Sequence, residues 1–417
     1  MTSIQMTRMY PVRFGLGLCV MTICLMAADQ PEQSVQTNNM SAIPQLVPPY
    51  IKPNPYDFSD ITAGGYHTCA IRNNGNVYCW GLNDTGQAGV WSTTPLCNNQ
   101  KTNCVLKPTF VTTTAQIDAG ADHTCALSNY GEASCWGNGS FGQLGSINFG
   151  YQSQPAPVMG NHIFTSISSG TQSTCGNAAD GVYCWGAIVD SVHGSNPVQM
   201  ITTFGQSTVT SISVGHLHVC VLAFPGSAHT PICLGNDQFG QLGVEPIANS
   251  LQYTGYTGST LGYSVSRLST QYNFTCVDQA SGVVQCVGAD DVGQLGNGQT
   301  IWNGTFQAQS VGNGMPLHGV TAGFDHACAL DPGGNAYCWG NGLKGQLGNS
   351  AAANFNTPQA VSGGLAFRKV AAGTLHTCGI TIDNQIYCWG NNFYGQLGAG
   401  YQQDYSIWYP VRASDPN

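Results

Sequence analysis

The chain has 417 residues, enough for one large domain or for two or three ordinary ones. Only 7% of the residues are Asp, Glu, Lys or Arg, against roughly a quarter in a typical soluble domain, and the net charge is −9. No cluster of Lys and Arg occurs, which argues against binding to a nucleic-acid backbone or to an anionic membrane surface. The hydrophobic share of 42% is ample for a packed core, so the low charge does not indicate disorder.

The beginning of the chain, residues 1–28, reads as an export signal. Two arginines precede the apolar run "FGLGLCVMTICLM" (14–26), and Ala27 or Ala28 is the expected cleavage site. A membrane span needs about 20 apolar residues, so a retained anchor is the weaker alternative, and lipidation is a minor one. Residues 29–55 are rich in Pro, Gln and Asn and read as an extended leader or linker. We therefore expect a secreted or extracytoplasmic protein.

A segment with two cysteines recurs seven times and organises the rest of the chain. The first cysteines of successive units are 45 to 56 residues apart, which is the length of one four-stranded propeller blade. The segments lack a 3.6-residue apolar period and carry glycine throughout, which argues against a helical solenoid. The pairs are Cys69 and Cys79, Cys125 and Cys135, Cys175 and Cys184, Cys220 and Cys233, Cys276 and Cys286, Cys328 and Cys338, and Cys378 and Cys388, with a further pair, Cys97 and Cys104, in an insertion after the first hairpin.

Each unit reads as a β-hairpin with one cysteine on each strand. In the first unit, a turn at "NNGN" places Cys69 opposite Cys79 and Ile71 opposite Val77. Directly opposed residues of a non-hydrogen-bonded antiparallel pair have Cα atoms ~4.5 Å apart, a separation that a disulfide accepts. Zinc would need closely spaced ligand pairs, which the sequence lacks, whereas an export signal and an even cysteine count favour disulfides. We expect one disulfide in each hairpin and one in the insertion.

The units share more than their cysteines. Gly-x-x-His precedes the first cysteine in five units, as in "GADHTC", and "GQLG" or a near copy follows the second in six, as in "CWGNGSFGQLG". This pattern, G-x-x-H-x-x-x-L…G-x-V-x-x-W-G-x-N-x-x-G-Q-L-G, resembles the repeat of the regulator of chromosome condensation family over about residues 58–413. The resemblance implies a seven-bladed β-propeller. Members of that family bind proteins, and they include a secreted propeller that inhibits β-lactamases.

We therefore predict an all-β fold in which residues 56–417 form a single seven-bladed propeller. Three units depart from the pattern: the third lacks "GQLG", the fifth lacks the Gly and His ("STQYNFTC"), and the fourth and fifth lack Trp. Those departures indicate blades that are distorted or adapted to a partner. A Pro-Val strand at the C-terminus has no hairpin after it, so we expect residues 409–413 to pair with the first blade and close the ring.

Few residues are candidates for catalysis. A histidine that recurs at one repeat position indicates a structural hydrogen bond, and the recurring tryptophans indicate packing between blades. The sequence contains no G-x-S-x-G, H-E-x-x-H or EF-hand motif, so we expect no catalytic residue, no metal and no cofactor. Asp290 and Asp291 are kept as the carboxylates that an alternative, enzymatic interpretation would use. The repeated histidines are His67, His123, His218, His326 and His376.

The candidates for partner binding are the positions that vary from unit to unit while the rest of the repeat pattern is constant. They lie immediately before "GQ" and immediately before the repeat histidine or its equivalent, in loops that a propeller presents on a face. Rigid aromatic side chains on such loops are good binding anchors. The alternative, that the aromatic side chains fill gaps between blades, stays open. The candidate partner-binding residues are Phe141, Phe239, Phe393, Tyr394, Asp122 and Asp325.

The leading hypothesis is a secreted propeller that binds a macromolecule, a protein above all, through loops on one face. It predicts no nucleic-acid partner and no membrane contact beyond the export signal. An extracellular hydrolase or lyase using loop carboxylates is the alternative from the enzyme class. Guanine-nucleotide exchange, as the nuclear family member performs, ranks lower because oxidised cysteines place the protein where no such GTPase works. A self-associating surface or matrix component is the last alternative.

Overall fold

The computed structural model describes most of the chain beyond the leader. The expected export signal and leader, residues 1–55, lie outside the described residues, and the folded unit is Lys52–Asn417. Within the described part, no helix is long and apolar enough to cross a membrane. No group of three His, Cys, Asp or Glu side chains in that part could hold a metal ion. The described ranges are 57–90, 96–97, 102–147, 149–187, 193–202, 208–224, 230–243, 264–403 and 406–416.

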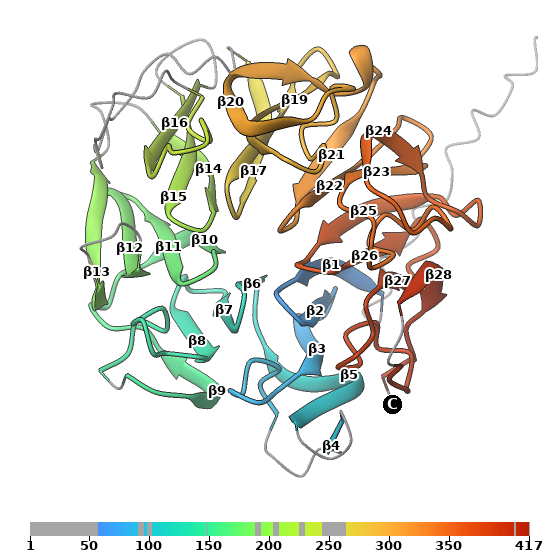
Figure 1. The fold of residues 1–417 in the computed structure, drawn as a ribbon. Helices are drawn as coiled ribbons and strands as arrows, with labels where there is room; N and C mark the ends of the chain where they lie inside the picture. The colour runs from blue at the N-terminus through green and yellow to red at the C-terminus, as the bar shows by residue number, and fades with distance from the viewer. Residues whose placement is uncertain are drawn as a thin grey trace, which may run out of the picture. The chain divides into compact units, whose positions relative to one another are not determined.

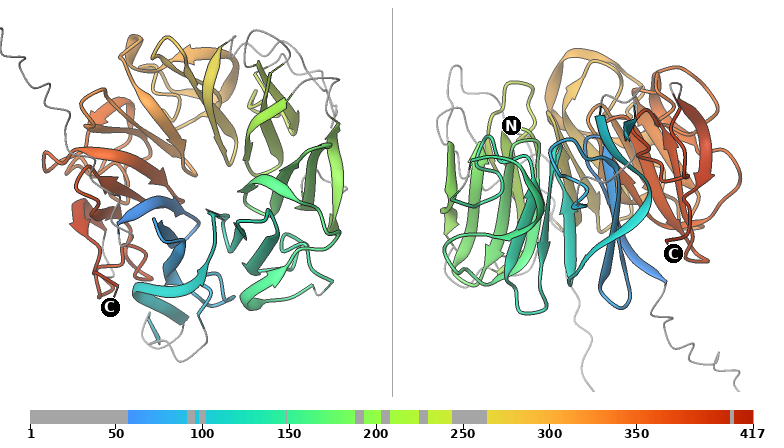
Figure 2. Two further views of the ribbon diagram at one scale, coloured as in Figure 1. Left: turned by 180° about the vertical axis from the view of Figure 1, so that it is seen from behind. Right: turned by 90° about the horizontal axis from the view of Figure 1, so that it is seen from below.

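The strands of the folded unit form seven antiparallel sheets around a central channel (Figure 1). Each sheet is one blade, and its first three strands follow chain order from the channel outward. Figure 2 shows the same ring of blades from behind and from the side. The first blade carries the short extra strand β4 (Leu96–Cys97), and the described part of the fourth blade has three strands. The predicted all-β seven-bladed propeller is confirmed.

The strands fall into four concentric sets. The innermost are β1 (Phe58–Ala63), β6 (Gln116–Ala119), β10 (Phe164–Ser169), β14 (Thr208–Val214), β17 (Val265–Gln271), β21 (His318–Ala322) and β25 (Phe367–Ala372). The second are β2 (His67–Arg72), β7 (His123–Leu127), β11 (Ser173–Ala178), β15 (His218–Phe224), β18 (Phe274–Gln279), β22 (His326–Leu330) and β26 (His376–Thr381). The third are β3 (Asn76–Leu82), β8 (Ala133–Gly137), β12 (Gly181–Ala187), β16 (Thr230–Gly235), β19 (Val284–Asp290), β23 (Ala336–Gly340) and β27 (Ile386–Gly390). The outer strands are β5 (Thr102–Thr113), β9 (Gln152–Pro157), β13 (His193–Thr202), β20 (Ile301–Ser310), β24 (Phe355–Ala360) and β28 (Ile407–Arg412), and a 3₁₀ turn, η1 (Val311–Asn313), follows β20.

The second and third strands of every blade are joined by a disulfide. In the first blade, Cys69 pairs directly with Cys79 and Ile71 with Val77, as the turn at "NNGN" predicts. In all seven hairpins the two cysteines are register partners, with Cα atoms 4.0 to 4.1 Å apart. The hairpin bonds are Cys69 to Cys79, Cys125 to Cys135, Cys175 to Cys184, Cys220 to Cys233, Cys276 to Cys286, Cys328 to Cys338 and Cys378 to Cys388.

The cysteine spacing varies between hairpins without changing this pairing. Cys175 and Cys184 are 9 positions apart, and Cys220 and Cys233 are 13 apart, whereas the other five hairpin pairs are 10 apart. The difference is therefore taken up in the turn and not in the register of the two strands. Cys97 is bonded to Cys104 in the insertion. The expected pairing is confirmed for all sixteen cysteines from 69 onward.

The C-terminal strand is the last strand of the ring, as expected, but its hydrogen-bonding partner differs from the prediction. β28 pairs with β27 and completes the seventh blade, whereas the first blade begins with its own inner strand, β1. The C-terminal segment meets the first blade through side chains instead, because Ile407 and Ala413 share a core cluster with Phe58 and Ile71. Residues 409–413 thus help to close the ring by packing, and not by strand pairing with the first blade.

Candidate functional site

One side of the ring carries both sets of variable loop residues. In each blade, the loop between the first and second strands and the loop after the third strand lie at the same end of the antiparallel sheet. We call this side the GQ face. A backbone hydrogen bond joins the two loops: the Asn138 N–H donates to the Asp122 carbonyl, and the Asn341 N–H to the Asp325 carbonyl, both at 2.8 Å. The residue before the repeat histidine is therefore held in place by its own blade.

The buried glutamine of each "GQ" loop orients the residue that precedes the loop's glycine. The Phe141 N–H donates to Oε1 of Gln143 at 2.9 Å, and the Tyr394 N–H donates to Oε1 of Gln396 at 2.9 Å. Both glutamines are buried. The glycine between them has positive φ, +83° at Gly142, which an L side chain would resist. These loops consequently present their variable side chains from a fixed backbone.

Beneath the GQ face, neighbouring blades share one main-chain acceptor. At the joint of the first and second blades, the Gln87 carbonyl accepts hydrogen bonds from the Thr124 hydroxyl (2.9 Å) and the Trp136 indole N–H (3.1 Å). Because the Thr124 proton is used there, the hydroxyl oxygen accepts the Nε2–H of His67 at 2.8 Å. The arrangement fixes the neutral Nε2–H tautomer of His67. The same four-residue joint recurs at three more places: His123–Thr174–Gln143–Trp185, His326–Thr377–Gln346–Trp389 and His376–Thr68–Gln396–Trp80.

The joint of the fourth and fifth blades keeps His218, Thr275 and the Gln241 carbonyl, with Val287 in place of the tryptophan. The other two joints lack both the histidine and the threonine that would bond it. Ser173 replaces the histidine in the third blade, and Val219 replaces the threonine that would have bonded it. Phe274 replaces the histidine in the fifth blade, and Ala327 replaces the next threonine. An apolar cluster that includes Val219 and Leu234 fills the joint of the third and fourth blades. The repeat histidine is therefore a structural donor between blades.

Burial lowers the pKa of all five repeat histidines to about 3, so each is neutral in the folded protein. Unfolding then takes up a proton at each histidine below the ordinary pKa near 6.5, and the stabilisation is lost as pH falls from there toward 3. We expect the imidazole NMR signals of His67, His123, His218, His326 and His376 to stay unshifted between pH 8 and pH 5.

A variant measures the size of this effect. His123→Ser introduces the residue that Ser173 provides in the third blade. Between about pH 6 and 4, we expect the unfolding free energy of the variant to fall less steeply with acidification than that of wild type, by about 1.4 kcal/mol per pH unit. Denaturant unfolding of wild type and variant across that range gives the difference. Buried carboxyls titrate alike in both proteins and cancel. Parallel pH profiles would contradict the buried, neutral assignment.

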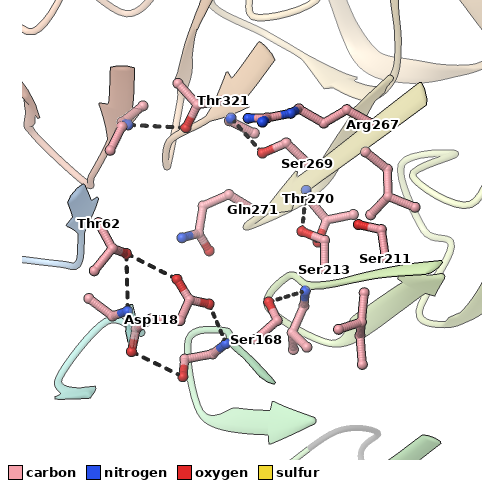
Figure 3. A pocket seen from close by; sticks show the side chains of 18 of the residues that line it. Thr62, Asp118, Ser168, Ser211, Ser213, Arg267, Ser269, Thr270, Gln271 and Thr321 are labelled. Carbon is pink, nitrogen blue, oxygen red and sulfur yellow. Dashed lines mark hydrogen bonds between the residues drawn. The ribbon is translucent and has the colours of Figure 1, made fainter. Parts of the chain in front are cut away.

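The central channel contains a polar pocket of about 470 Å³, lined by the innermost strand of every blade (Figure 3). At one repeat position, a side-chain oxygen accepts a backbone N–H of the next blade. The donor–acceptor pairs are Ala119 N to Thr62 Oγ1 (3.1 Å), Ser169 N to Asp118 Oδ2 (2.7 Å), Val214 N to Ser168 Oγ (3.2 Å), Thr270 N to Ser213 Oγ (2.9 Å), Ala322 N to Ser269 Oγ (2.9 Å) and Ala372 N to Thr321 Oγ1 (3.2 Å). These lining groups therefore serve to join blades.

Between the seventh and first blades, charged groups take the place of the side-chain oxygen that accepts a backbone N–H at the other blade borders. Ala371 occupies the position, and Lys369 forms an ion pair with Asp60 instead. Within the channel, Asp118 is the one member of the repeat position with a carboxyl group. Burial raises the pKa of Asp118 to about 6, against the opposing effect of the hydrogen bonds that its oxygens accept.

The structure distributes the predicted binding residues over three parts of the GQ face. Phe393 and Tyr394 lie edge to face in the seventh blade, with ring centroids 4.9 Å apart, and Tyr394 contacts Tyr66 of the first blade at 5.3 Å. Phe141 projects from the second blade with 36% of its surface exposed. Asp122 faces Asp84; burial and that neighbouring charge raise the pKa of Asp122.

Two of the predicted residues, Phe239 and Asp325, line the same pocket. It has a volume of about 410 Å³ and lies between loops of the fourth, fifth and sixth blades. Tyr272, Phe324 and Trp302 also line it, and the sequence analysis did not select them. A comparison of repeat positions would have indicated two of them, because Tyr272 and Phe324 are aromatic where four other units have Gly, Ala or Thr.

Asp290 and Asp291 do not form a free pair of carboxylates. Asp290 is buried, and its Oδ1 accepts the Leu295 N–H at 3.1 Å, as Oδ1 of Asn392 accepts the Leu397 N–H in the seventh blade. Burial raises the pKa of Asp290 to about 7. Asp290 therefore takes the loop-forming place of an asparagine. Asp291 accepts a hydrogen bond from the Gln294 amide at 2.8 Å and lines the pocket with Asp325.

The fold and this face define a class of protein: a seven-bladed propeller with preformed loops on one face. Family models described as the regulator of chromosome condensation (RCC1) repeat match residues 58–87, 115–143, 318–346 and 367–396, and also 74–127, 333–380 and 383–417. The chain therefore contains RCC1 repeats, and its structure is a seven-bladed propeller. Propellers of this family are typically non-enzymatic domains that bind proteins or act as exchange factors.

Named relatives cover different shares of the chain. The ultraviolet-B receptor UVR8 of Arabidopsis thaliana is 26% identical over 311 residues, which are 72% of this chain and 68% of UVR8. The human E3 ubiquitin-protein ligase HERC2 is 25% identical over 69% of this chain, but this chain spans only 5% of HERC2. The crystal structure of Prp20p from Saccharomyces cerevisiae superposes with a TM-score of 0.70, at 18% identity, over 87% of each chain. The likeness to Prp20p concerns the fold alone.

Proposed function

We propose that this protein is a secreted binding protein that recognises a protein partner through the GQ face. The observation that carries the proposal is the fixed presentation of variable aromatic side chains on loops that buried glutamines hold. Rigid aromatic anchors lose little conformational entropy on binding, so such a surface suits a protein partner. Prp20p was studied for its binding to Gsp1p and histones, which supports a protein as the kind of partner.

Export is the second part of the proposal. Eight cysteine pairs at bonding distance fit an oxidising compartment, and the apolar run at 14–26 fits an export signal. The mass of the chain isolated outside the cytoplasm tests this part. A chain that begins after Ala27 or Ala28 supports it, and an uncleaved chain found only in the cytoplasm contradicts it.

The test of partner binding uses alanine at Phe141, Phe239 and Tyr394. We expect the triple variant to lose capture of the partner that wild type retains from the producing cell's surroundings, because truncated anchors at an interface cost about 1 kcal/mol or more each. Thermal unfolding of both proteins serves as the control for folding. Equal capture by wild type and a folded triple variant would show that the partner uses a different face.

A further inference from the structure

The pocket between the fourth, fifth and sixth blades differs from the rest of the GQ face in its aromatic content. The residue two places before the repeat-histidine position is aromatic only in these blades: His216, Tyr272 and Phe324. Tyr272 stacks on Phe324 with ring centroids 3.8 Å apart and 28° between the planes, and His216 lies 5.2 Å from Tyr272. The rings form a continuous stack across three blades.

The backbone of the fifth blade changes where the stack is built. In other blades a glycine stands three places before the histidine, because a Cβ there would meet the histidine ring; at Gly120 it would lie 2.3 Å from Cε1 of His123. The fifth blade has Gln271 at that place, together with Phe274 for the histidine. Gln271 extends into the channel (Figure 3), and Tyr272 next to it adopts a φ of +38°. A positive φ at a bulky residue costs free energy and is typical of functional sites.

The charge of the pocket is negative. Asp291 and Asp325 line it, and no Lys, Arg or His is among its lining residues. Burial and the nearby charge of Asp291 raise the pKa of Asp325 to about 6. The pKa of Asp325 is still below neutral pH, so its carboxylate is ionised there, and a bound cation would offset the effect of the Asp291 charge on it.

Trp302 completes the aromatic lining. It projects from β20 with 83% of its surface exposed, so packing in the folded chain does not account for it. The faces of Trp, Tyr and Phe attract cations within about 6 Å, by about 0.5–2 kcal/mol each. Arginine combines a planar group that stacks on aromatic rings with donors that match a carboxylate. The pocket thus offers both kinds of interaction that a guanidinium group uses.

We propose that the pocket lined by Phe239, Tyr272, Trp302, Phe324, Asp291 and Asp325 binds an arginine side chain of the partner protein. This proposal rests on the proposed function of the GQ face and adds the chemistry of one contact.

The chain contains a matched control for the two carboxylates. Asp84 and Asp122 occupy, in the first and second blades, the repeat positions of Asp291 and Asp325 in the fifth and sixth. As in the pocket, burial and, to a smaller extent, the charge of Asp84 raise the pKa of Asp122. Ala121 stands there in place of Phe324, so this second acidic pair lacks the aromatic stack.

The experiment titrates the whole ¹⁵N-labelled propeller with N-acetyl-arginine amide and with the neutral N-acetyl-citrulline amide, followed by NMR. We expect saturable shifts, centred on the Trp302 indole signal, with the arginine probe and none with citrulline. We expect Asp291→Asn together with Asp325→Asn to lower the affinity for the arginine probe about tenfold, and Trp302→Ala to lower it severalfold. Asp84→Asn with Asp122→Asn leaves the affinity unchanged. Acidification below pH 6 lowers the affinity for the arginine probe because Asp325 takes up a proton.

Two results would overturn the proposal: no saturable shift with the arginine probe in wild type, or the same loss of affinity from the Asp84/Asp122 variant. Either result leaves the proposed function standing if the triple alanine variant still loses its partner. Conversely, a probe that binds as expected, with partner capture unaffected by the triple variant, contradicts the proposed function of the loops and not the chemistry of the pocket.

Discussion

Replacement of Trp136 by alanine will lower the free energy of unfolding by about 3–5 kcal/mol, the range for a large buried aromatic residue. Trp136 is fully buried at the joint of the first and second blades. Its removal leaves a cavity beside Gly89 and leaves the Gln87 carbonyl with the Thr124 hydroxyl as its side-chain donor. Denaturant unfolding followed by circular dichroism measures the change.

Trp302→Ala is the matched control for Trp136→Ala. Both substitutions remove an indole, but Trp302 is 83% exposed, so we expect its removal to change the unfolding free energy by no more than about 0.5 kcal/mol. Similar losses from the two variants would refute the role of the blade joints in stability.

Reduction of the disulfides will unfold the propeller. Each hairpin disulfide closes a loop of about ten residues, and chain-entropy estimates give about 2–3 kcal/mol for such a loop. Seven such contributions together equal or exceed the usual stability of about 5–15 kcal/mol of a folded protein. We expect thermal melting monitored with and without a reductant to show loss of the folded state at ambient temperature in the reduced sample.

A single pair gives the graded form of this prediction. Cys125→Ala together with Cys135→Ala should lower the unfolding free energy by about 2–3 kcal/mol and leave the other bonds intact. Replacement of both cysteines avoids a free thiol that could exchange with neighbouring disulfides. An unchanged melting temperature after complete reduction, checked by mass, would contradict the stabilising role of the hairpin bonds.

The repeat made the blades predictable, and the first inner strand shows where that reasoning stopped. The hairpin register follows from cysteine spacing and turn residues alone. β1 carries no Pro-Val motif that would indicate a strand before the first hairpin, and a bulge between Phe58 and Asp60 interrupts its two-residue alternation. Without β1, the predicted first blade lacked a strand, and the C-terminal strand was assigned to it. The structure assigns that strand to the seventh blade because Tyr387 and Cys388 pair with Arg412 and Val411.

The sequence predicted which loop positions carry binding residues, but not which of these residues lie next to one another in the ring. Phe239 and Asp325 were selected separately, and the pocket that unites them depends on loops from three successive blades. Tyr272 and Phe324 stand two places before the repeat-histidine position. They are therefore outside the two variable positions that the repeat indicates. Trp302 lies on an outer strand whose sequence does not repeat clearly. Contacts between loops of different blades and an outer strand depend on tertiary packing, which the repeat pattern in the sequence does not specify.

The shared glutamine acceptor gives the ring a direction, since at the four complete joints one blade supplies the carbonyl and its successor supplies the tryptophan and threonine donors. A duplicated unit inserted between the first and second blades would meet complementary groups on both flanks. The same unit placed between the third and fourth would face Val219 and Leu234, which offer it no donor. Growth of such a ring by gene duplication is therefore easier at some borders than at others, and the third and fourth units constrain each other's evolution.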